Sequence, residues 1–212
     1  MTSAREEILA RVTSALGTDR QPPADLPQRA RVTWDAGRTV DQFVETTADY
    51  RAIVERTVVN SLPQHIAAAL AGASAASVIR PAGLDPSWLT GFPGTVLTDD
   101  HHTAYDLDSI DAVITAAAVG IAATGTVVLD HGPDQGRRAI SLVPDVHVCV
   151  IRADQVVPDV PEATAALREA INERRPLTWI SGPSATSDIE LDRVEGVHGP
   201  RTLHVIIVDQ DG

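Results

Sequence analysis

The residue types best suited to binding or acid–base chemistry gather near the end of the chain. Between the apolar runs Leu177–Ile180 and Leu203–Val208, the segment contains two Gly-Pro pairs and three serines. Ser187, Asp188 and Glu190 follow the Ser-x-x-Glu order of a capping box, so they predict the start of a helix. The free backbone amides of a helix start can bind an anion. Two interpretations stay open: a cap that only shapes the chain, or a cap that also holds a ligand.

His198 and Arg201 flank a Gly199-Pro200 turn directly before the second apolar run. A histidine can donate or accept a proton near neutral pH, and an arginine can hold a carboxylate or a phosphate. The alternative is that both side chains only fix the loop through backbone hydrogen bonds. A ligand site is favoured if Arg201 lies near the predicted helix start.

An earlier motif, GIAATGT at 120–126, has the Gly-x4-Gly spacing of a phosphate-binding loop. The lysine that such a loop requires is absent, because Thr126-Val127 follows Gly125. The motif therefore predicts a turn between two strands or, as the alternative, a cradle of backbone amides and threonine hydroxyls for another anion. The segment GPSAT at 182–186 does not match a nucleophile elbow, since its last residue is Thr186 instead of glycine.

These motifs give a set of candidate ligand-binding residues, whereas no catalytic residue can be assigned. A metal site is not predicted, because no His-Glu-x-x-His frame occurs and DDHHT at 99–103 is typical of a solvated loop. The candidates are Thr124, Gly125, Thr126, Gly182, Ser184, Ser187, Asp188, His198, Gly199 and Arg201.

Composition restricts the possible partners and cofactors. The net charge of −12 disfavours nucleic acid and anionic lipid as partners. The single cysteine, Cys149, cannot supply the thiolates that an iron–sulfur cluster needs. The uncharged run at 112–129 is interpreted as two buried strands around a turn, and the N-terminus does not resemble a signal peptide. A cytoplasmic protein without a membrane span is expected.

Helical spacing dominates the first part of the chain. We expect residues 1–38 to form an N-terminal helix and an extended arm, Gly17–Gly37, and residues 39–212 to form the main domain. One long helix is predicted over 39–60 with Thr39 as its N-cap, and a second from Pro63 to Gly72.

Short β-branched runs follow, and they predict a three-layer α/β sandwich with a mixed sheet. A covering helix is predicted over 160–175, and a hairpin is predicted within 125–143. The expected strands are ASVIRP, GTVLT, DAVITAA, GTVVLD, RAISLV, VHVCVI, LTWIS and LHVIIV.

Four blocks, in this order, resemble the lactate utilization protein C family, the LutC/YkgG proteins of the LUD domain. They are GIAATGTVVLD, GRRAISLVPDVHVCVIRADQVV, SGPSATSDIE and GVHGPRTLHVIIV, and they span 120–208. The resemblance implies an α/β fold similar to the NagB/RpiA/CoA-transferase-like group. It also implies a role in oxidising L-lactate to pyruvate beside iron–sulfur partner proteins, with no cofactor in this chain.

The resemblance leaves the biochemical step open. Members often carry an acidic residue where this chain has Ala123, so a carboxylate acting there as a nucleophile or base is not available. Three functions remain: a cluster-free component of a lactate-oxidising system, a stand-alone enzyme on a CoA-linked or phosphorylated metabolite, or a sensor of small acids. A small carboxylate or phosphate ligand and a homo-oligomer are compatible with each.

Overall fold

The computed structural model describes residues 3–17, 32–186, 194–195 and 199–209. The chain divides into two units, Met1–Arg31 and Val32–Gly212. In the first unit, α1 (Ala4–Leu16) confirms the predicted N-terminal helix, and it begins with a capping box formed by Ser3 and Glu6. The apolar side chains of α1 are exposed. Most of the predicted arm lies outside the described residues.

The second unit corrects the prediction of one helix over 39–60. Helix α2 (Ala36–Asp49) begins three residues before the predicted domain boundary, and Asp35 caps it by accepting a hydrogen bond from the Arg38 amide. Thr39 is instead a buried residue of the first turn. The chain leaves the helix through Arg51, whose φ is +69°, and enters strand β1 (Ile53–Val58). The valines and isoleucine of this segment fit both helical and strand spacing, and the turn at Arg51 decides between them.

Among the described residues, six strands form one parallel sheet in the order β1-β12-β7-β4-β2-β3. Its members after β1 are β2 (Ser77–Arg80), β3 (Thr95–Thr98), β4 (Ala112–Ala116), β7 (Val146–Arg152) and β12 (Thr202–Asp209). The central strands are apolar on both faces, as a sheet covered on both sides requires.

A smaller sheet combines one parallel pair with two antiparallel pairs, so the predicted mixed pairing is present but lies outside the main sheet. Its order is β8-β5-β6-β9, formed by Val156–Val157, Val119–Ile121, Thr126–Leu129 and Thr178–Ile180. The predicted hairpin within 125–143 is wrong, because Arg138–Ser141 forms a 3-10 turn, η3, and β6 pairs with β5 and β9 instead. A short pair, β10 (Ala185–Thr186) with β11 (Val194–Glu195), completes the strands.

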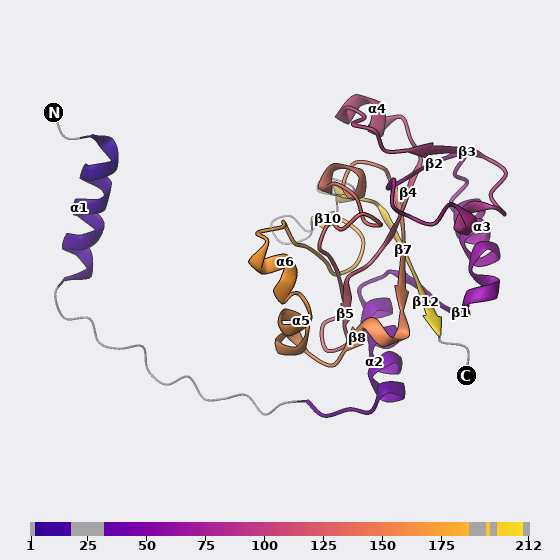
Figure 1. Ribbon diagram of the computed structural model, residues 1–212, viewed down its shortest axis with the longest axis horizontal. Coiled ribbons are helices and arrows are strands. Elements are labelled where there is room, and N and C mark those ends of the chain that lie inside the picture. The colour runs from indigo at the N-terminus through magenta and orange to yellow at the C-terminus, as the bar shows by residue number, and fades with distance from the viewer. Residues whose placement is uncertain (1–2, 18–31, 187–193, 196–198, 210–212) are drawn as a thin grey trace. The chain divides into compact units, whose positions relative to one another are not determined.

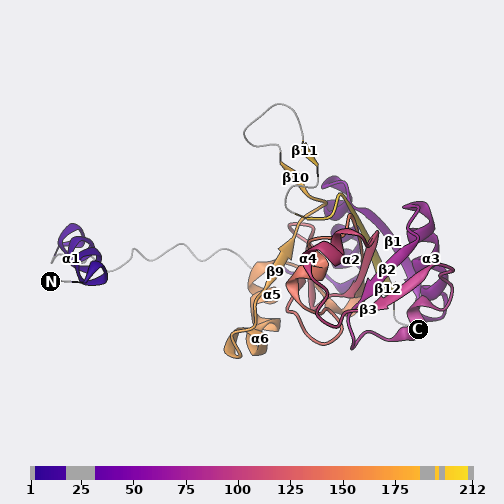
Figure 2. The same cartoon turned by 90° about the horizontal axis from the view of Figure 1, so that it is seen from above.

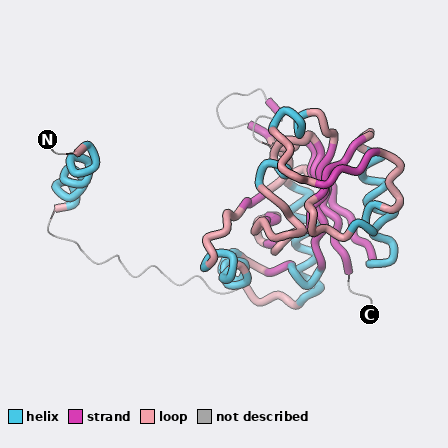
Figure 3. Tube along the Cα trace, turned by 45° about the horizontal axis from the view of Figure 1, so that its top comes forward, coloured by secondary structure: helices cyan, strands magenta, loops and turns pink. Residues whose placement is uncertain are grey.

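Two apolar cores on opposite faces of the main sheet give the predicted three-layer α/β arrangement. Helix α3 (Leu62–Gly72), which confirms the predicted second helix, packs on one face with Trp88. On the other face, Phe43 of α2 packs with Val127 of the smaller sheet and with Cys149 and Val205. In Figure 1, α3 and α2 lie on different sides of the main sheet, and Figure 3 shows helices on both sides of the strands.

Helices α5 (Val160–Ala166) and α6 (Arg168–Asn172) confirm the predicted covering helix, with a break at Leu167. They cover the outer side of the smaller sheet through Ala163 and Leu167, and Figure 2 shows them beside β9. The remaining short helices are α4 (Ala104–Asp108), η1 (Val59–Ser61), η2 (Pro86–Leu89) and η4 (Ala153–Gln155). Within the described ranges, no helix has the length and apolarity needed to cross a membrane.

Candidate functional site

A cavity of about 340 Å³ lies where the two sheets approach each other. Its walls come from η3, from the amino ends of β7 and β12, and from β9 with the loop that follows it. A volume of this size is at the lower end of what small-molecule sites occupy. The cavity is therefore the candidate functional site.

Three of the predicted ligand-binding residues line this cavity: Gly182, Ser184 and Gly199. The Ser184 amide donates a 2.8 Å hydrogen bond to the carbonyl of Pro200, which joins the two Gly-Pro segments to each other. Gly182 has a φ of +79°, and a Cβ there would lie 2.4 Å from the Tyr50 carbonyl oxygen. Only glycine fits at position 182, because any larger residue would be strained at this φ and would clash with the Tyr50 carbonyl.

The GIAATGT motif contacts a residue of the cavity wall, Ser181, without lining the cavity itself. Its turn joins β5 to β6, as the simpler of the two sequence interpretations predicts. The Thr126 hydroxyl lies 2.7 Å from the Ser181 hydroxyl, and Ser181 lines the cavity. Thr124 lies 2.7 Å from Thr126. These hydroxyls hold the β9 loop in place, and neither threonine forms part of the cavity wall among the described residues. Their binding of an anion stays a prediction.

Arg201 is not brought to this cavity. It is exposed, its Nε lies 3.4 Å from Asp145 Oδ1, and it lines a separate acidic cavity with Asp108 and Asp111. Arg138 of η3 lies in the wall of the candidate site instead. The pattern RAISLV predicts a strand that begins at Arg138, so this residue is not among the predicted ligand-binding residues. Ser187, Asp188 and His198 lie outside the described residues.

His147, the second residue of β7, lines the same cavity and is fully buried. Its Nε2 lies 2.8 Å from the Thr115 hydroxyl, and its Nδ1 has no hydrogen-bond partner among the described residues. Burial lowers the pKa of His147 to about 4, so the imidazole is neutral at physiological pH. No spacing pattern marks this residue as part of a site, because it is a single histidine in an apolar strand.

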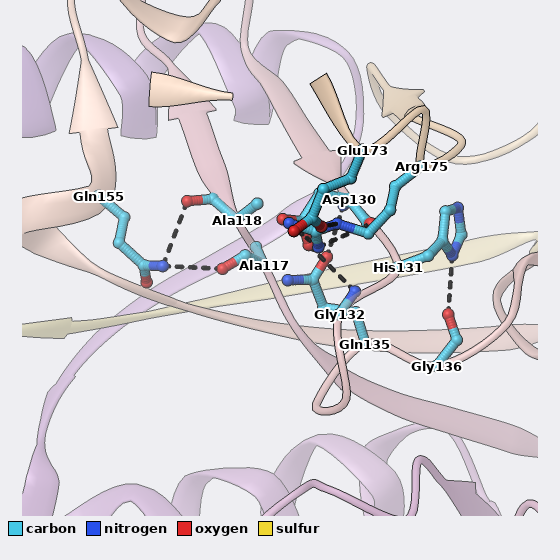
Figure 4. A network of polar contacts seen from close by, with 10 residues as sticks. All are labelled: Ala117, Ala118, Asp130, His131, Gly132, Gln135, Gly136, Gln155, Glu173 and Arg175. Atoms are coloured by element: carbon cyan, nitrogen blue, oxygen red, sulfur yellow. Dashed lines mark hydrogen bonds and ion pairs between the residues drawn. The ribbon is translucent and has the colours of Figure 1, made fainter. Parts of the chain in front are cut away.

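The loop after β6 fixes another part of the cavity wall, Thr178. His131 Nδ1 donates to the Gly136 carbonyl at 2.8 Å, so its Nε2 is left to accept a hydrogen bond from the Thr178 hydroxyl, also at 2.8 Å. Figure 4 shows this loop, whose Asp130 forms a 2.9 Å ion pair with Arg175 from the segment before β9. The loop therefore ties β9 to β6 beyond their strand pairing.

Ala123 lies in the β5–β6 turn, where its amide donates to the Pro158 carbonyl. It is not in the cavity wall. In DDHHT, Asp99 forms a 2.7 Å ion pair with Arg137. Within the described ranges, no group of three potential metal ligands occurs.

The fold and the cavity define a three-layer α/β protein with one arginine and several hydroxyl groups around a site of small-molecule size. The LUD domain model matches residues 83–208. The chain is 46% identical to a lactate utilization protein C of Deinococcus radiodurans, over 97% of this chain and 95% of that protein. A second lactate utilization protein C, from Halalkalibacterium halodurans, is 31% identical over 99% of this chain and all of that protein.

A solved structure agrees with these sequence matches. The crystal structure of a DUF162 family protein from Deinococcus radiodurans superposes with a TM-score of 0.73 and 44% sequence identity, covering 83% of this chain and 99% of that one. The chain therefore belongs to the LUD domain family, and within it to the lactate utilization protein C family.

Proposed function

We propose that this protein serves lactate utilization by binding a small organic anion in the cavity beside Arg138, and that it works with iron–sulfur proteins during the oxidation of L-lactate to pyruvate. Two relatives named lactate utilization protein C, similar over almost their whole length, support the metabolic role. The cavity itself supports the class of ligand.

The observation that carries the proposal is the charge of the cavity wall. Arg138 is exposed and forms no ion pair within the described part of the chain, and no Asp or Glu is among the described residues of the wall. The Ser181 and Ser184 side chains add hydroxyl groups. An unpaired guanidinium with neighbouring hydroxyls favours a carboxylate or a phosphate over a cation.

This chain has no set of cysteines that could hold an iron–sulfur cluster for the electrons of the oxidation. Cys149 is the single cysteine, it is fully buried, and burial raises its thiol pKa to about 12. A protonated, enclosed thiol does not act as a cluster ligand or as a nucleophile. The proposal therefore assigns the redox step to partner proteins and assigns binding of the acid to this chain.

Binding of the anion can be measured by thermal unfolding and by calorimetry with L-lactate, pyruvate, inorganic phosphate and CoA. A ligand at about 100 times its Kd adds about 2.7 kcal/mol to the free energy of unfolding. We expect stabilisation by a carboxylate, and about a 10- to 100-fold loss of affinity in Arg138→Ala, since a hydrogen bond to a charged group contributes about 1.5–3 kcal/mol.

Arg201→Ala is the matched control, because Arg201 is also exposed but lies against Asp145 in the other cavity. It is expected to bind as the wild type does. An equal loss of affinity for the anion in Arg138→Ala and Arg201→Ala would contradict the proposed site. Stabilisation by CoA or phosphate alone would favour the stand-alone enzyme.

The metabolic role can be tested by complementation. In a bacterium that has lost its own lactate utilization protein C, this chain is expected to restore growth on L-lactate, and growth on glucose serves as the control. The Arg138→Ala variant is expected to restore growth poorly at equal protein abundance. Full restoration of growth by Arg138→Ala would show that the metabolic role does not depend on anion binding at Arg138.

A further inference from the structure

A third cavity, of about 250 Å³, lies at the carboxyl ends of the parallel strands, whereas the candidate functional site lies at the amino ends of β7 and β12. Four neighbouring strands contribute to its wall, through Ala116 of β4, Arg152 of β7, Val208 of β12 and Val59 directly after β1. We name it the carboxyl-end cavity. The described walls of the two cavities share no residue, so they are separate sites.

The connections of the main sheet favour a ligand site at this end of the strands. Strand β2 is followed by β3 toward one edge of the sheet, and β4 is followed by β7 toward the other edge, so the direction of the chain reverses between β2 and β4. In open parallel sheets, ligands bind beyond the carboxyl ends of the strands at such a reversal. The wall of the carboxyl-end cavity contains Ala116 and Ala117 from the end of β4 and Trp88 from the connection after β2, so it lies at this point.

The polar side chain of Gln155 in this wall already has partners within the chain. Its amide nitrogen donates to the carbonyls of Ala117 and Ala118, at 2.8 and 3.2 Å, and its amide oxygen accepts from the Arg152 amide at 3.0 Å. Figure 4 shows Gln155 directed at the two alanines. The other uncharged residues of the described wall are alanine, valine, leucine and tryptophan, so an occupant meets mainly apolar side chains.

The two charged residues of the wall have opposite signs. Arg152 Nε lies 3.0 Å from Asp154 Oδ1, and Asp134 is the acid of the wall. An anionic ligand would compete with Asp154 for the guanidinium and would be repelled by Asp134, whereas a cationic ligand would be repelled by Arg152. An uncharged ligand avoids this repulsion and keeps the gain from burying apolar surface. The candidate functional site differs, because Arg138 there has no ion pair within the described residues.

We propose that the carboxyl-end cavity binds an uncharged aromatic ring, which packs against Trp88 and the aliphatic side chains of the wall. The volume is sufficient, because an apolar cavity of about 150 Å³ can hold benzene. Trp88 is only partly buried where it packs on the core, and two aromatic rings attract each other beyond the apolar area that they bury. The inference goes beyond the proposed function and does not depend on it, since it concerns a different cavity.

Two tryptophans distinguish the two cavities, because Trp88 lines the carboxyl-end cavity and Trp179 lines the candidate functional site. In ¹H–¹⁵N spectra of the full chain each indole N–H gives its own signal, and Trp88→Phe identifies the signal of Trp88. Benzyl alcohol is expected to shift the Trp88 signal to saturation and to leave the Trp179 signal unchanged. A Trp88 signal that does not move, or a shift of Trp179 alone, would overturn the inference.

Three probes with the same ring test the class of ligand: benzyl alcohol is uncharged, benzylamine is a cation and benzoate is an anion. We expect benzyl alcohol to bind about tenfold more tightly than either charged probe, because a charge must lose water to enter the cavity. If benzylamine or benzoate binds as tightly as benzyl alcohol, the cavity does not select an uncharged ligand and the inference is wrong.

Trp88→Leu tests the aromatic contact. Cyclohexylmethanol has a saturated ring in place of the aromatic one, and the wild type is expected to bind it about three- to tenfold more weakly than benzyl alcohol. In Trp88→Leu this preference is expected to fall below about twofold while cyclohexylmethanol still binds, as measured by ligand-observed NMR. A tryptophan with a purely structural role would leave the preference unchanged.

Val59→Asp tests whether the ring enters the cavity. Val59 is 55% exposed, so the variant is expected to fold, and its carboxylate is expected to lower the affinity for benzyl alcohol about tenfold. Val160→Asp is the matched control, because Val160 is 38% exposed in the first turn of α5 and lies outside the described wall. It is expected to bind benzyl alcohol as the wild type does. The same loss of affinity in the two variants would show that the ring binds elsewhere.

Discussion

Gly125→Ala is expected to lower the free energy of unfolding by about 3 kcal/mol. Gly125 has a φ of +58°, and a Cβ there would lie 2.6 Å from the carbonyl carbon and oxygen of Thr46. Strain at positive φ costs about 1–3 kcal/mol, and overpacking against a fixed backbone costs a similar amount. The helix cannot easily yield, since the Thr46 hydroxyl is bonded to the Ala122 carbonyl at 2.7 Å. Urea unfolding measures the change.

Gly72→Ala is the control for this substitution. Gly72 ends helix α3, and a Cβ there would meet nothing within 4 Å. Alanine is favoured over glycine in a helix by up to about 1 kcal/mol, so this variant is expected to match or exceed the wild type in stability. If the two variants have the same free energy of unfolding, close packing of the β5–β6 turn against α2 does not explain why residue 125 must be glycine.

The Gly125→Ala variant also tests how the turn supports the cavity. Movement of the turn away from α2 displaces Thr126, which holds Ser181 in the cavity wall. The anion affinity of the folded variant is therefore expected to fall together with its stability.

Arg137→Met is expected to destabilise the fold by about 3 kcal/mol. Arg137 donates from Nε and Nη2 to both oxygens of Asp99, at 2.7 and 2.9 Å, and Nη2 also donates to the His102 carbonyl. Only 9% of the Asp99 side chain is exposed. Removing one partner of a buried pair leaves an uncompensated charge, which commonly costs about 3–5 kcal/mol.

The pH dependence of this effect has a definite sign. Burial raises the pKa of Asp99, but the hydrogen bonds and charge of Arg137 outweigh it and hold the pKa below its ordinary 3.8. The ion pair therefore stabilises the fold above pH 3.8, and this contribution is lost as the pH falls through the lower folded-state pKa. In Arg137→Met, burial still raises the pKa of Asp99 and only the weaker contacts of His102 still lower it, so Asp99 is protonated more easily than in the wild type. The difference between variant and wild type is expected to shrink from pH 7 to pH 4.

Arg56→Met controls for the geometry of the ion pair. Arg56 also binds both oxygens of an aspartate, Asp209, but 31% of the Asp209 side chain is exposed, against 9% for Asp99. An exposed pair contributes about 0–1 kcal/mol, so a small effect with little pH dependence is expected. A loss in Arg56→Met as large as in Arg137→Met would show that burial is not the deciding factor.

Much of the fold follows from local sequence patterns. Strands such as β4, β7 and β12 are continuous β-branched runs that only a sheet covered on both faces accommodates. Pro63 and Gly72 mark the ends of α3 because each fixes or frees the backbone there. In contrast, the spacing of apolar residues over 39–60 fits both a helix and a strand, and the structure contains one of each there. The composition of RAISLV at 138–143 suits a strand, but Arg138–Ser141 forms a 3-10 turn.

The candidate site was only partly predictable. Gly182, Ser184 and Gly199 belong to a loop whose glycine and proline content already indicates a special turn. Arg138 and His147 belong to the 3-10 turn η3 and to β7 of the main sheet. The rest of the wall comes from β9 and the loop after it, which only the packing of the smaller sheet against the main sheet brings to these two residues. A single arginine in a turn and a single histidine in an apolar strand have no local spacing that distinguishes them from structural residues.

The position of β12 has a consequence for synthesis on the ribosome. Strand β12 lies between β1 and β7, so the first strand of the main sheet pairs only with the last. Such distant pairing folds slowly, because most of the chain must be present before it forms. While the protein is translated, β1 and β7 therefore keep open hydrogen-bonding edges until Thr202–Asp209 emerges from the exit tunnel. The nascent chain is therefore exposed to misassembly until β12 has been made, because the main sheet closes only then.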